Sequence, residues 1–236
     1  MKSAIFTILA VLLFSGSASA ASITITNPSF ESVTSDSNTT ACTTGGTLNV
    51  GSYIDNTVAT AGGCVDPTPV PGWVMAGDSA GVFRPTSASI ASGVTGNDTA
   101  YSNGATITQT LGSAAVAATY TLQVDIGRRL DTTFNGYTIS LSAGSTVLGS
   151  HTSQVSPAAG TFATDTLSVI VPANSTAIGQ TLTVTLQSAG QQVDFDNVRL
   201  SSAPTVPALP AGGAAILALG LMVAAWFAFR RSPRTV

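Results

Sequence analysis

Charged side chains are scarce in this 236-residue chain, and basic ones are the scarcest. Only 8% of the residues are charged, and Lys2 is the single lysine. Residues 21–205 carry four arginines against eleven acidic residues, which gives this part a formal charge of −7. A nucleic-acid-binding surface needs clustered lysine and arginine. The composition therefore excludes a nucleic-acid partner and leaves room for one neutral-to-acidic domain with a real core.

Histidine is nearly absent as well, because His151 is the only one. No serine or cysteine nucleophile is assigned to it, and the string Gly77-Asp78-Ser79-Ala80-Gly81 is too short to indicate a protease. Two carboxylates could hydrolyse a glycoside, but eleven acidic residues without geometry select no pair. We therefore predict a protein that is not an enzyme, and keep a carbohydrate-active enzyme as a distant alternative.

Cysteine occurs only twice, at Cys42 and Cys64. An even pair in an exported chain is typical of a disulfide, which here would close a loop over residues 42–64. Closing such a loop is worth about 3 kcal/mol in the chain-entropy model. A zinc site is not expected, since no third or fourth soft ligand lies nearby.

The first 20 residues have the composition of a secretory signal peptide. Lys2 supplies the positive charge, residues 5–14 are apolar, and Ala18-Ser19-Ala20 is a small-residue cleavage site. The apolar stretch is short for a membrane helix. We predict a signal helix over residues 1–20, removed on export.

Near the other end, residues 211–229 are apolar and uncharged. At about 1.5 Å per residue they match a hydrocarbon core of about 30 Å. Arg230 and Arg231 follow as a stop-transfer signal, in a basic tail over 230–236 that should stay in the cytoplasm. We predict a linker over 204–210 and a transmembrane helix over 211–229; a buried core helix is the alternative.

The linker contains Val206, Pro207, Leu209 and Pro210. This motif, the apolar span and the arginines together resemble the PEP-CTERM sorting signals of Gram-negative bacteria, in the Val-Pro-x-Leu-Pro variant. Ala208 stands where the usual signal has an acidic residue. The resemblance implies an exosortase-like processing enzyme, the export machinery and the membrane as partners. It also implies a domain outside the cytoplasmic membrane, either anchored there or processed to the cell surface or extracellular matrix.

Alternating apolar and polar residues recur along the exported part, as in half-buried strands. In one of them, Tyr120, Leu122, Val124 and Ile126 face one way. The expected strands are 23–26, 106–111, 120–126, 137–141, 166–171, 181–186 and 192–200. No amphipathic helix interrupts them. We predict an all-β fold over residues 21–203, an antiparallel β-sandwich or jelly roll.

Several short motifs appear in a characteristic order: Asn27-Pro28-Ser29-Phe30-Glu31, Val70-Pro71-Gly72-Trp73, and a closing segment over residues 193–200. In this order they resemble galactose-binding-domain-like jelly rolls, the fold of many carbohydrate-binding modules. That resemblance implies a structural calcium ion held by Glu31 and Asp196. Asp196 alternates with Val198 and Leu200, so we expect it to point inward, where a carboxylate needs a partner. The alternatives are hydration or an ion pair with an arginine.

A sugar site combines an aromatic platform with fixed polar groups. The candidates are Trp73, Tyr101, Tyr137, Gln123, Asp125 and Arg128. Each has a purely structural explanation, such as a core ring or a solvated strand face. We predict a surface protein that binds exopolysaccharide or envelope glycans without catalysis. A structural matrix protein without a specific ligand is the alternative.

Overall fold

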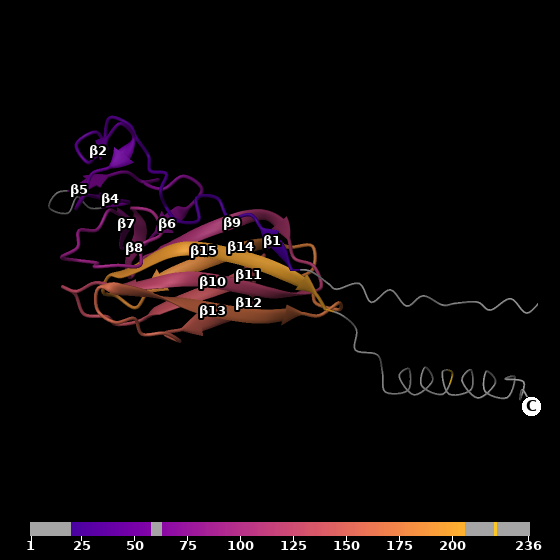
Figure 1. Cartoon of the computed structure of the whole chain (residues 1–236). Helices are drawn as coiled ribbons and strands as arrows, with labels where there is room; N and C mark the ends of the chain where they lie inside the picture. The colour runs from indigo at the N-terminus through magenta and orange to yellow at the C-terminus, as the bar shows by residue number, and fades with distance from the viewer. Residues whose placement is uncertain (1–19, 58–62, 206–219, 221–236) are drawn as a thin grey trace, which may run out of the picture. The chain divides into compact units, whose positions relative to one another are not determined.

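The structure, a computed structural model, describes residues 20–57 and 63–205 together with Gly220. The described strands form two packed sheets of a β-sandwich, so the all-β prediction is confirmed (Figure 1). The predicted signal helix, sorting motif, transmembrane helix and basic tail lie outside the described residues, apart from Ala20 and Gly220. Among the described residues, no helix is long and apolar enough to cross a membrane.

The larger sheet has eight strands. Its order is β13 (Thr161–Val171), β10 (Ala118–Arg128), β15 (Val193–Pro204), β8 (Thr99–Asn103), β7 (Ser79–Phe83), β4 (Tyr53–Asp55) and β5 (Gly63–Val65). The eighth strand, β1 (Ala21–Ile23), pairs with the C-terminal half of β15. β4 and β5 run parallel, and the other pairs in this sheet are antiparallel.

The smaller sheet has five strands, in the order β12 (Thr146–Thr152), β11 (Tyr137–Ala143), β14 (Thr181–Ser188), β9 (Thr106–Ala114) and β6 (Val74–Ala76). The predicted inward set of β10, Tyr120, Leu122, Val124 and Ile126, is buried in the core between the sheets. β2 (Thr43–Thr44) and β3 (Thr47–Leu48) form a separate hairpin. The short strands β2, β4, β5, β6 and β7 gather at one end of the sandwich (Figure 1).

The sequence located the long strands but missed the short ones. β9, β10, β11, β13, β14 and β15 contain or largely overlap the predicted segments, whereas the first strand lies at 21–23 instead of 23–26. β2 to β8 were not predicted, because strands of two to five residues are too short for alternation to be visible. β12 was missed because Gly149 and His151 interrupt its apolar pattern.

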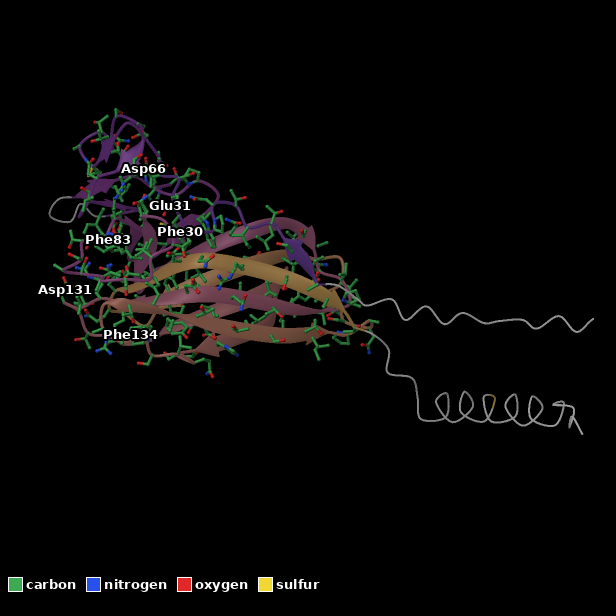
Figure 2. The ribbon with its side chains drawn as sticks, viewed as in Figure 1. Phe30, Glu31, Asp66, Phe83, Asp131 and Phe134 are labelled. Carbon is green, nitrogen blue, oxygen red and sulfur yellow. A yellow bond between two sulfur atoms is a disulfide. The ribbon has the colours of Figure 1, made fainter. Side chains whose placement is uncertain are left out.

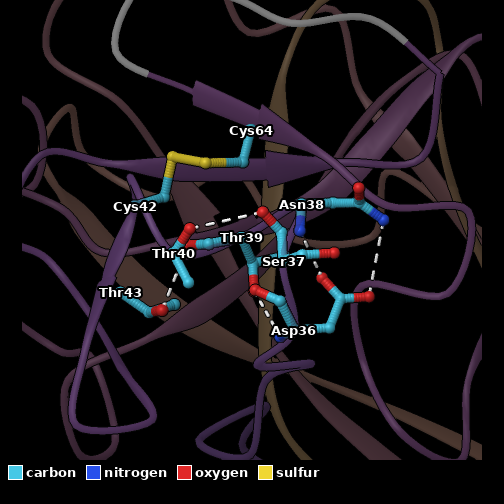
Figure 3. The surroundings of a disulfide bond; sticks show 8 residues. All are labelled: Asp36, Ser37, Asn38, Thr39, Thr40, Cys42, Thr43 and Cys64. Atoms are coloured by element: carbon cyan, nitrogen blue, oxygen red, sulfur yellow. Dashed lines mark hydrogen bonds between the residues drawn. A yellow bond between two sulfur atoms is a disulfide. The ribbon is translucent and has the colours of Figure 1, made fainter.

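The predicted disulfide is present. Cys42 and Cys64 are joined, with their Cα atoms 6.0 Å apart (Figure 3). The turns before Cys42 are held by local bonds: the amide of Asn38 donates to a carboxylate oxygen of Asp36 at 2.8 Å, and the hydroxyl of Thr43 donates to the carbonyl of Thr39 at 3.1 Å. The disulfide therefore ties an irregular segment to β5 of the larger sheet.

A bulge in β15 changes the face on which its acids lie. Asp125 pairs with Asp196 but Gln123 pairs with Arg199, so β15 has one extra residue there, and Asn197 takes a φ of 48°. Phe195 and Val198 both lie in the core as a result. Asp196 therefore sits on the face opposite to the core, and the expected inward orientation was wrong. Simple alternation fails where a bulge resets the phase.

Candidate active site

One row of residues crosses the outer face of the larger sheet, the face turned away from the sandwich core. Register partners in neighbouring strands point to the same side of a sheet. The row consists of Phe162, Gly127, Asp194, Tyr101, Gly81 and Asp55, which come from β13, β10, β15, β8, β7 and β4. We call these residues the outer row. Sheet pairing thus brings together two acids and two aromatic rings from distant parts of the chain.

Two glycines make room for an aromatic ring beside Asp194 in the outer row. A Cβ added to Gly127 would lie 2.5 Å from the Phe162 ring and 2.9 Å from Cβ of Asp194. Gly93, in the loop that covers this face, has a φ of 96°, and its Cβ would lie 3.1 Å from Phe162. These glycines let the Phe162 ring pack on the backbone of β10, next to Asp194.

Aromatic rings form a second buried cluster on this face. Phe83, Ile90 and Tyr101 are buried together, with Tyr53, Val94 and Phe162 packed against them; we call these six residues the aromatic cluster. The rings of Tyr53 and Phe83 stack at 4.2 Å, and Tyr101 stands edge-on to Tyr53 at 5.3 Å. Such rings pack on planar apolar molecules, and their faces attract a positive charge.

Asp194 is one of the buried acids of this face. Its Oδ1 accepts a hydrogen bond from Nε2 of Gln192 at 2.9 Å. Its Oδ2 is buried and has no hydrogen-bond partner among the described residues. Burial raises the pKa of Asp194 to about 7, although the bond from Gln192 and the charge of Arg129 act in the opposite direction. A carboxyl with a pKa near 7 holds its proton for part of the time at neutral pH and is suited to act as a general acid.

Arg129 follows β10 and is largely covered, with 12% of its side chain exposed. It donates to both carboxylate oxygens of Asp131, at 2.7 and 2.6 Å, to Oε1 of Gln192 at 3.0 Å, and to the hydroxyl of Tyr53. Its guanidinium carbon lies 5.0 Å from the centre of the Phe83 ring. The hydrogen bond from Arg129 lowers the pKa of Asp131. Figure 2 shows Phe83 and Asp131 at the same end of the sandwich.

Tyr101 is anchored from the opposite side. Its hydroxyl donates to Oδ2 of Asp55 at 2.6 Å, and the hydroxyl of Ser79 donates to the same oxygen. Burial, together with the hydrogen bond and charge of Asp55, raises the pKa of Tyr101 well above its ordinary value. Tyr101 therefore stays protonated and presents a neutral ring edge to the cluster.

A depression of about 310 Å³ opens beside the aromatic cluster. Two cluster residues, Ile90 and Val94, line it together with Gly93 and Arg84. The depression therefore borders the aromatic cluster on the side of residues 90–94.

A second group of acids lies near this depression. Oε1 of Glu31 accepts the amides of Asn97 and Asp98, each at 2.8 Å, while the carboxylate of Asp196 accepts the amide of Thr95 at 2.5 Å. Asp98 is buried, and neither of its carboxylate oxygens has a hydrogen-bond partner among the described residues. The closest cation is Arg84, whose Nε lies 3.9 Å from Oδ1 of Asp98.

Burial raises the pKa values of Asp98 and Asp196 to about 7, and the charge of Glu31 adds to both shifts. Within the described part of the chain, no three His, Cys, Asp or Glu side chains form a group that could hold a metal ion. The predicted pair Glu31 and Asp196 is nevertheless joined to one loop segment, residues 95–98.

The residues predicted to bind sugar do not form one site. Trp73 is buried in the sandwich core, where its indole nitrogen donates to the carbonyls of Thr26 and Asn27 at 3.0 and 3.2 Å. Tyr137 is also in the core, and its hydroxyl donates to Asp165 at 2.6 Å. Neither ring is available as an exposed platform.

Gln123, Asp125 and Arg128 come from β10 but do not gather either. Gln123 and Asp125 share the outer face, as predicted from alternation; Asp125 accepts from Thr164 at 2.6 Å and from Arg199 at 3.2 Å. Nε of Arg128 is buried without a hydrogen-bond partner in the described part of the chain. Of the six predicted residues, only Tyr101 belongs to the outer row.

Sequence reasoning missed Asp194, Gln192, Phe83 and Arg129 as a group. In the sequence, Asp194 lay unremarked within the closing segment over residues 193–200, and Arg129 was one of the four arginines of residues 21–205. The one available signal was an acid between two core residues, Val193 and Phe195, in a strand flanked by strands on both sides. An acid in such a strand must find a special environment on the other face.

Comparison with known proteins gives a consistent answer. A family model described as HpiC1 cyclase, HpiC1-like, matches residues 21–201. The crystal structure of the Stig cyclase Fisc from Fischerella sp. TAU, in complex with (3Z)-3-(1-methyl-2-pyrrolidinylidene)-3H-indole, is 27% identical, with a TM-score of 0.61; the match covers 80% of this chain and 100% of that one.

The apo form of a cyclase from Fischerella sp. is 26% identical over the same shares of both chains, with a TM-score of 0.62. A cyclase from Fischerella sp. TAU in complex with 4-(1H-indol-3-yl)butan-2-one is 27% identical over 79% of this chain and 100% of that one, with a TM-score of 0.60. No curated protein matches.

These matches overturn the prediction of a non-catalytic protein that binds exopolysaccharide or envelope glycans, together with its matrix-protein and carbohydrate-enzyme alternatives. That prediction relied on the fold, and a β-sandwich hosts binding modules and enzymes alike. The acids and the rings of the outer row converge only in the folded sheet. The chain belongs to the HpiC1-like cyclase family.

Proposed function

We propose that this protein is a cyclase that protonates an electron-rich, apolar substrate of the indole class and closes a ring in it, with Asp194 as the acid. One observation carries the proposal. The buried Asp194 has an unpartnered oxygen and lies in the outer row between the Gly127–Phe162 pair and Tyr101. A proton donor enclosed by aromatic rings suits chemistry that generates a carbocation.

The chemistry needs only groups of this chain. The protonated carboxyl of Asp194 donates its proton to a carbon–carbon double bond or to the indole ring, which leaves a cation on the substrate and a carboxylate on the enzyme. A second π bond of the substrate attacks the cation and forms the new ring bond. Loss of a proton from the product cation to Asp194 restores the acid, so the product is an isomer of the substrate.

The surroundings of Asp194 support both the protonation step and the ring closure through a cation. The Phe162 ring, which lies beside Gly127 and Asp194, offers negative π density to a passing cation, at about 0.5–2 kcal/mol per contact. Covering by Ile90 and Val94 excludes water, which would otherwise capture the cation. Tyr101, which is held neutral by Asp55, presents no competing base.

The indole class rests on the relatives. Two of the similar cyclase structures hold molecules with an indole or 3H-indole ring. Planar rings of this kind fit an aromatic cluster whose members stack and meet edge-to-face.

The test is turnover of indoles that carry an alkenyl side chain, followed by chromatography with mass detection. In H2O we expect a product that has the mass of the substrate but a different retention time. In D2O the product should contain deuterium at the carbon that Asp194 protonates. Asp194→Asn should lower kcat by roughly 100-fold or more. Asp78→Asn is the matched control, because Asp78 is exposed and outside the cluster. Equal activity of Asp194→Asn and the native protein would contradict the assignment.

We further propose that Glu31 and Asp196, together with backbone carbonyl oxygens, hold a structural calcium ion. Support comes from the contacts of both carboxylates with residues 95–98, and from the charge of Glu31, which raises the pKa values of Asp98 and Asp196 and which a bound cation would offset. A hard cation favours such oxygen ligands. The ion would fix residues 95–98 against β15 and so hold one end of the loop that covers the aromatic cluster.

We also retain export as a proposal: a signal peptide over 1–20 and a PEP-CTERM-like tail read by an exosortase-like enzyme in a Gram-negative cell. The Cys42–Cys64 disulfide supports an oxidising compartment. The galactose-binding-like jelly roll is likewise proposed as the finer description of the sandwich. Cell fractionation with and without residues 206–236 tests the destination.

A further inference from the structure

Three side chains form a continuous line of hydrogen bonds that ends at the buried acid. Arg129 donates through a terminal guanidinium nitrogen to Oε1 of Gln192 at 3.0 Å. Nε2 of Gln192 donates to Oδ1 of Asp194 at 2.9 Å. Gln192 and Asp194 are buried, and Arg129 is largely covered, so water competes little for these bonds.

The chemistry of the first member fixes the orientation of the second. A guanidinium can only donate hydrogen bonds, so the Gln192 atom that faces Arg129 must be the carbonyl oxygen. The amide nitrogen of Gln192 must then face Asp194. One carboxyl oxygen of Asp194 is therefore occupied as an acceptor, and the other, Oδ2, is the oxygen left to carry a proton.

The guanidinium of Arg129 is itself fixed in position by several neighbouring groups. Asp131 receives a two-pronged bond, the hydroxyl of Tyr53 accepts another, and the Phe83 ring lies beneath the guanidinium. A two-pronged arginine–carboxylate pair restricts both position and orientation. The aromatic cluster and the acid thus share one anchor.

We infer that Arg129 and Gln192 are positioning residues for the cyclase reaction: Arg129 orients the Gln192 amide, and this amide turns the carboxyl of Asp194 so that its free oxygen Oδ2 is presented to substrate. This inference rests on the proposed function of Asp194. Neither residue needs to touch the substrate. They act on the orientation of the Asp194 carboxyl group. This orientation determines which carbon of the substrate receives the proton.

The competing explanation is a clamp that joins the loop after β10 to the start of β15 without any role in the reaction. The two explanations predict effects on different measured quantities. A clamp affects stability and substrate affinity. An orienting pair affects the rate of the protonation step, because misplacing a reacting group by about 1 Å costs roughly 100-fold while binding is retained.

The test combines kinetics with crystallography on the purified full chain. Gln192→Leu removes both hydrogen bonds at similar volume; we expect kcat to fall roughly 10–100-fold, KM to change less than about twofold, and the Asp194 carboxyl to rotate in the crystal structure. Arg129→Lys is the second variant, because one ammonium cannot serve Asp131 and Gln192 with the same geometry. Gln154→Leu is the matched control, because Gln154 is exposed and donates to the carbonyl of Thr152, away from Arg129 and Asp194, so it should retain kcat within about threefold.

The outcomes separate this inference from the function on which it depends. An unrotated carboxyl in Gln192→Leu overturns the inference, and so does a change in KM alone. If the native protein converts no indole substrate but the carboxyl still rotates, the positioning stands and the proposed reaction fails. If Gln192→Leu does not fold, Arg129→Lys decides by the same two measurements.

Discussion

The backbone of Gly127 lies directly opposite Asp194 in the sheet, and the side chain that Gly127 lacks is what allows Phe162 to pack beside that acid. A single methyl group at residue 127 would occupy the space of both neighbours. The candidate active site therefore depends on the missing side chain of Gly127 as well as on the side chains of Asp194 and Phe162.

Gly127→Ala should consequently disturb the site. Its Cβ would meet the Phe162 ring at 2.5 Å and Cβ of Asp194 at 2.9 Å, so one of them must shift. We expect a loss of about 1–3 kcal/mol of stability and a larger loss of turnover. Denaturant unfolding and the indole assay measure the two effects.

Gly112→Ala is the matched control for that substitution. Gly112 also lies in a strand, and a Cβ there would meet nothing within 4 Å. It should leave activity unchanged. Equal behaviour of the two variants would show that the space above Gly127 is not constrained.

Stability should fall as the pH rises through neutrality in calcium-free buffer. Burial raises the pKa values of Asp98, Asp194 and Asp196 to about 7 in the folded protein. The folded state therefore binds more protons than the unfolded chain between about pH 4 and pH 7, and the associated stability is lost as these protons leave. Melting temperatures at pH 5 and pH 8 check the direction; a higher value at pH 8 would contradict the raised pKa values.

Calcium should reverse much of that loss. At pH 8, where Asp98 and Asp196 are ionised, added calcium is expected to raise the melting temperature, and a chelator should lower it again. Glu31→Gln should weaken the response of the melting temperature to calcium, because it removes a negative charge that acts on both Asp98 and Asp196. An identical response in Asp125→Asn and Glu31→Gln would place the ion elsewhere, since Asp125 interacts with Thr164 and Arg199 instead.

Reduction of the Cys42–Cys64 disulfide should destabilise the protein by about 3 kcal/mol, because the unfolded chain regains the freedom of the closed loop. The Cys42→Ala/Cys64→Ala double variant should match the reduced native protein in denaturant unfolding. The double variant should itself not respond to reductant. A native protein insensitive to reductant would argue that the loop contributes nothing to folding.

The sequence by itself determined the all-β architecture, the long strands and the disulfide pair. Period-two alternation directly reports which residues of β10 are buried, as it did for Tyr120 to Ile126. Two nearby cysteines in an otherwise cysteine-free chain leave one pairing. These features are local, so a single stretch of chain contains the necessary information.

Only the tertiary structure decided the site. Arg129, Gln192 and Asp194 meet because β10 and β15 are neighbours in the sheet, and Phe162 and Tyr101 join them through β13 and β8. The bulge at Asn197 moved Asp196 to the outer face, against the alternation of its neighbours. A carboxyl becomes an acid at neutral pH through burial, and burial is produced by packing between segments far apart in the chain.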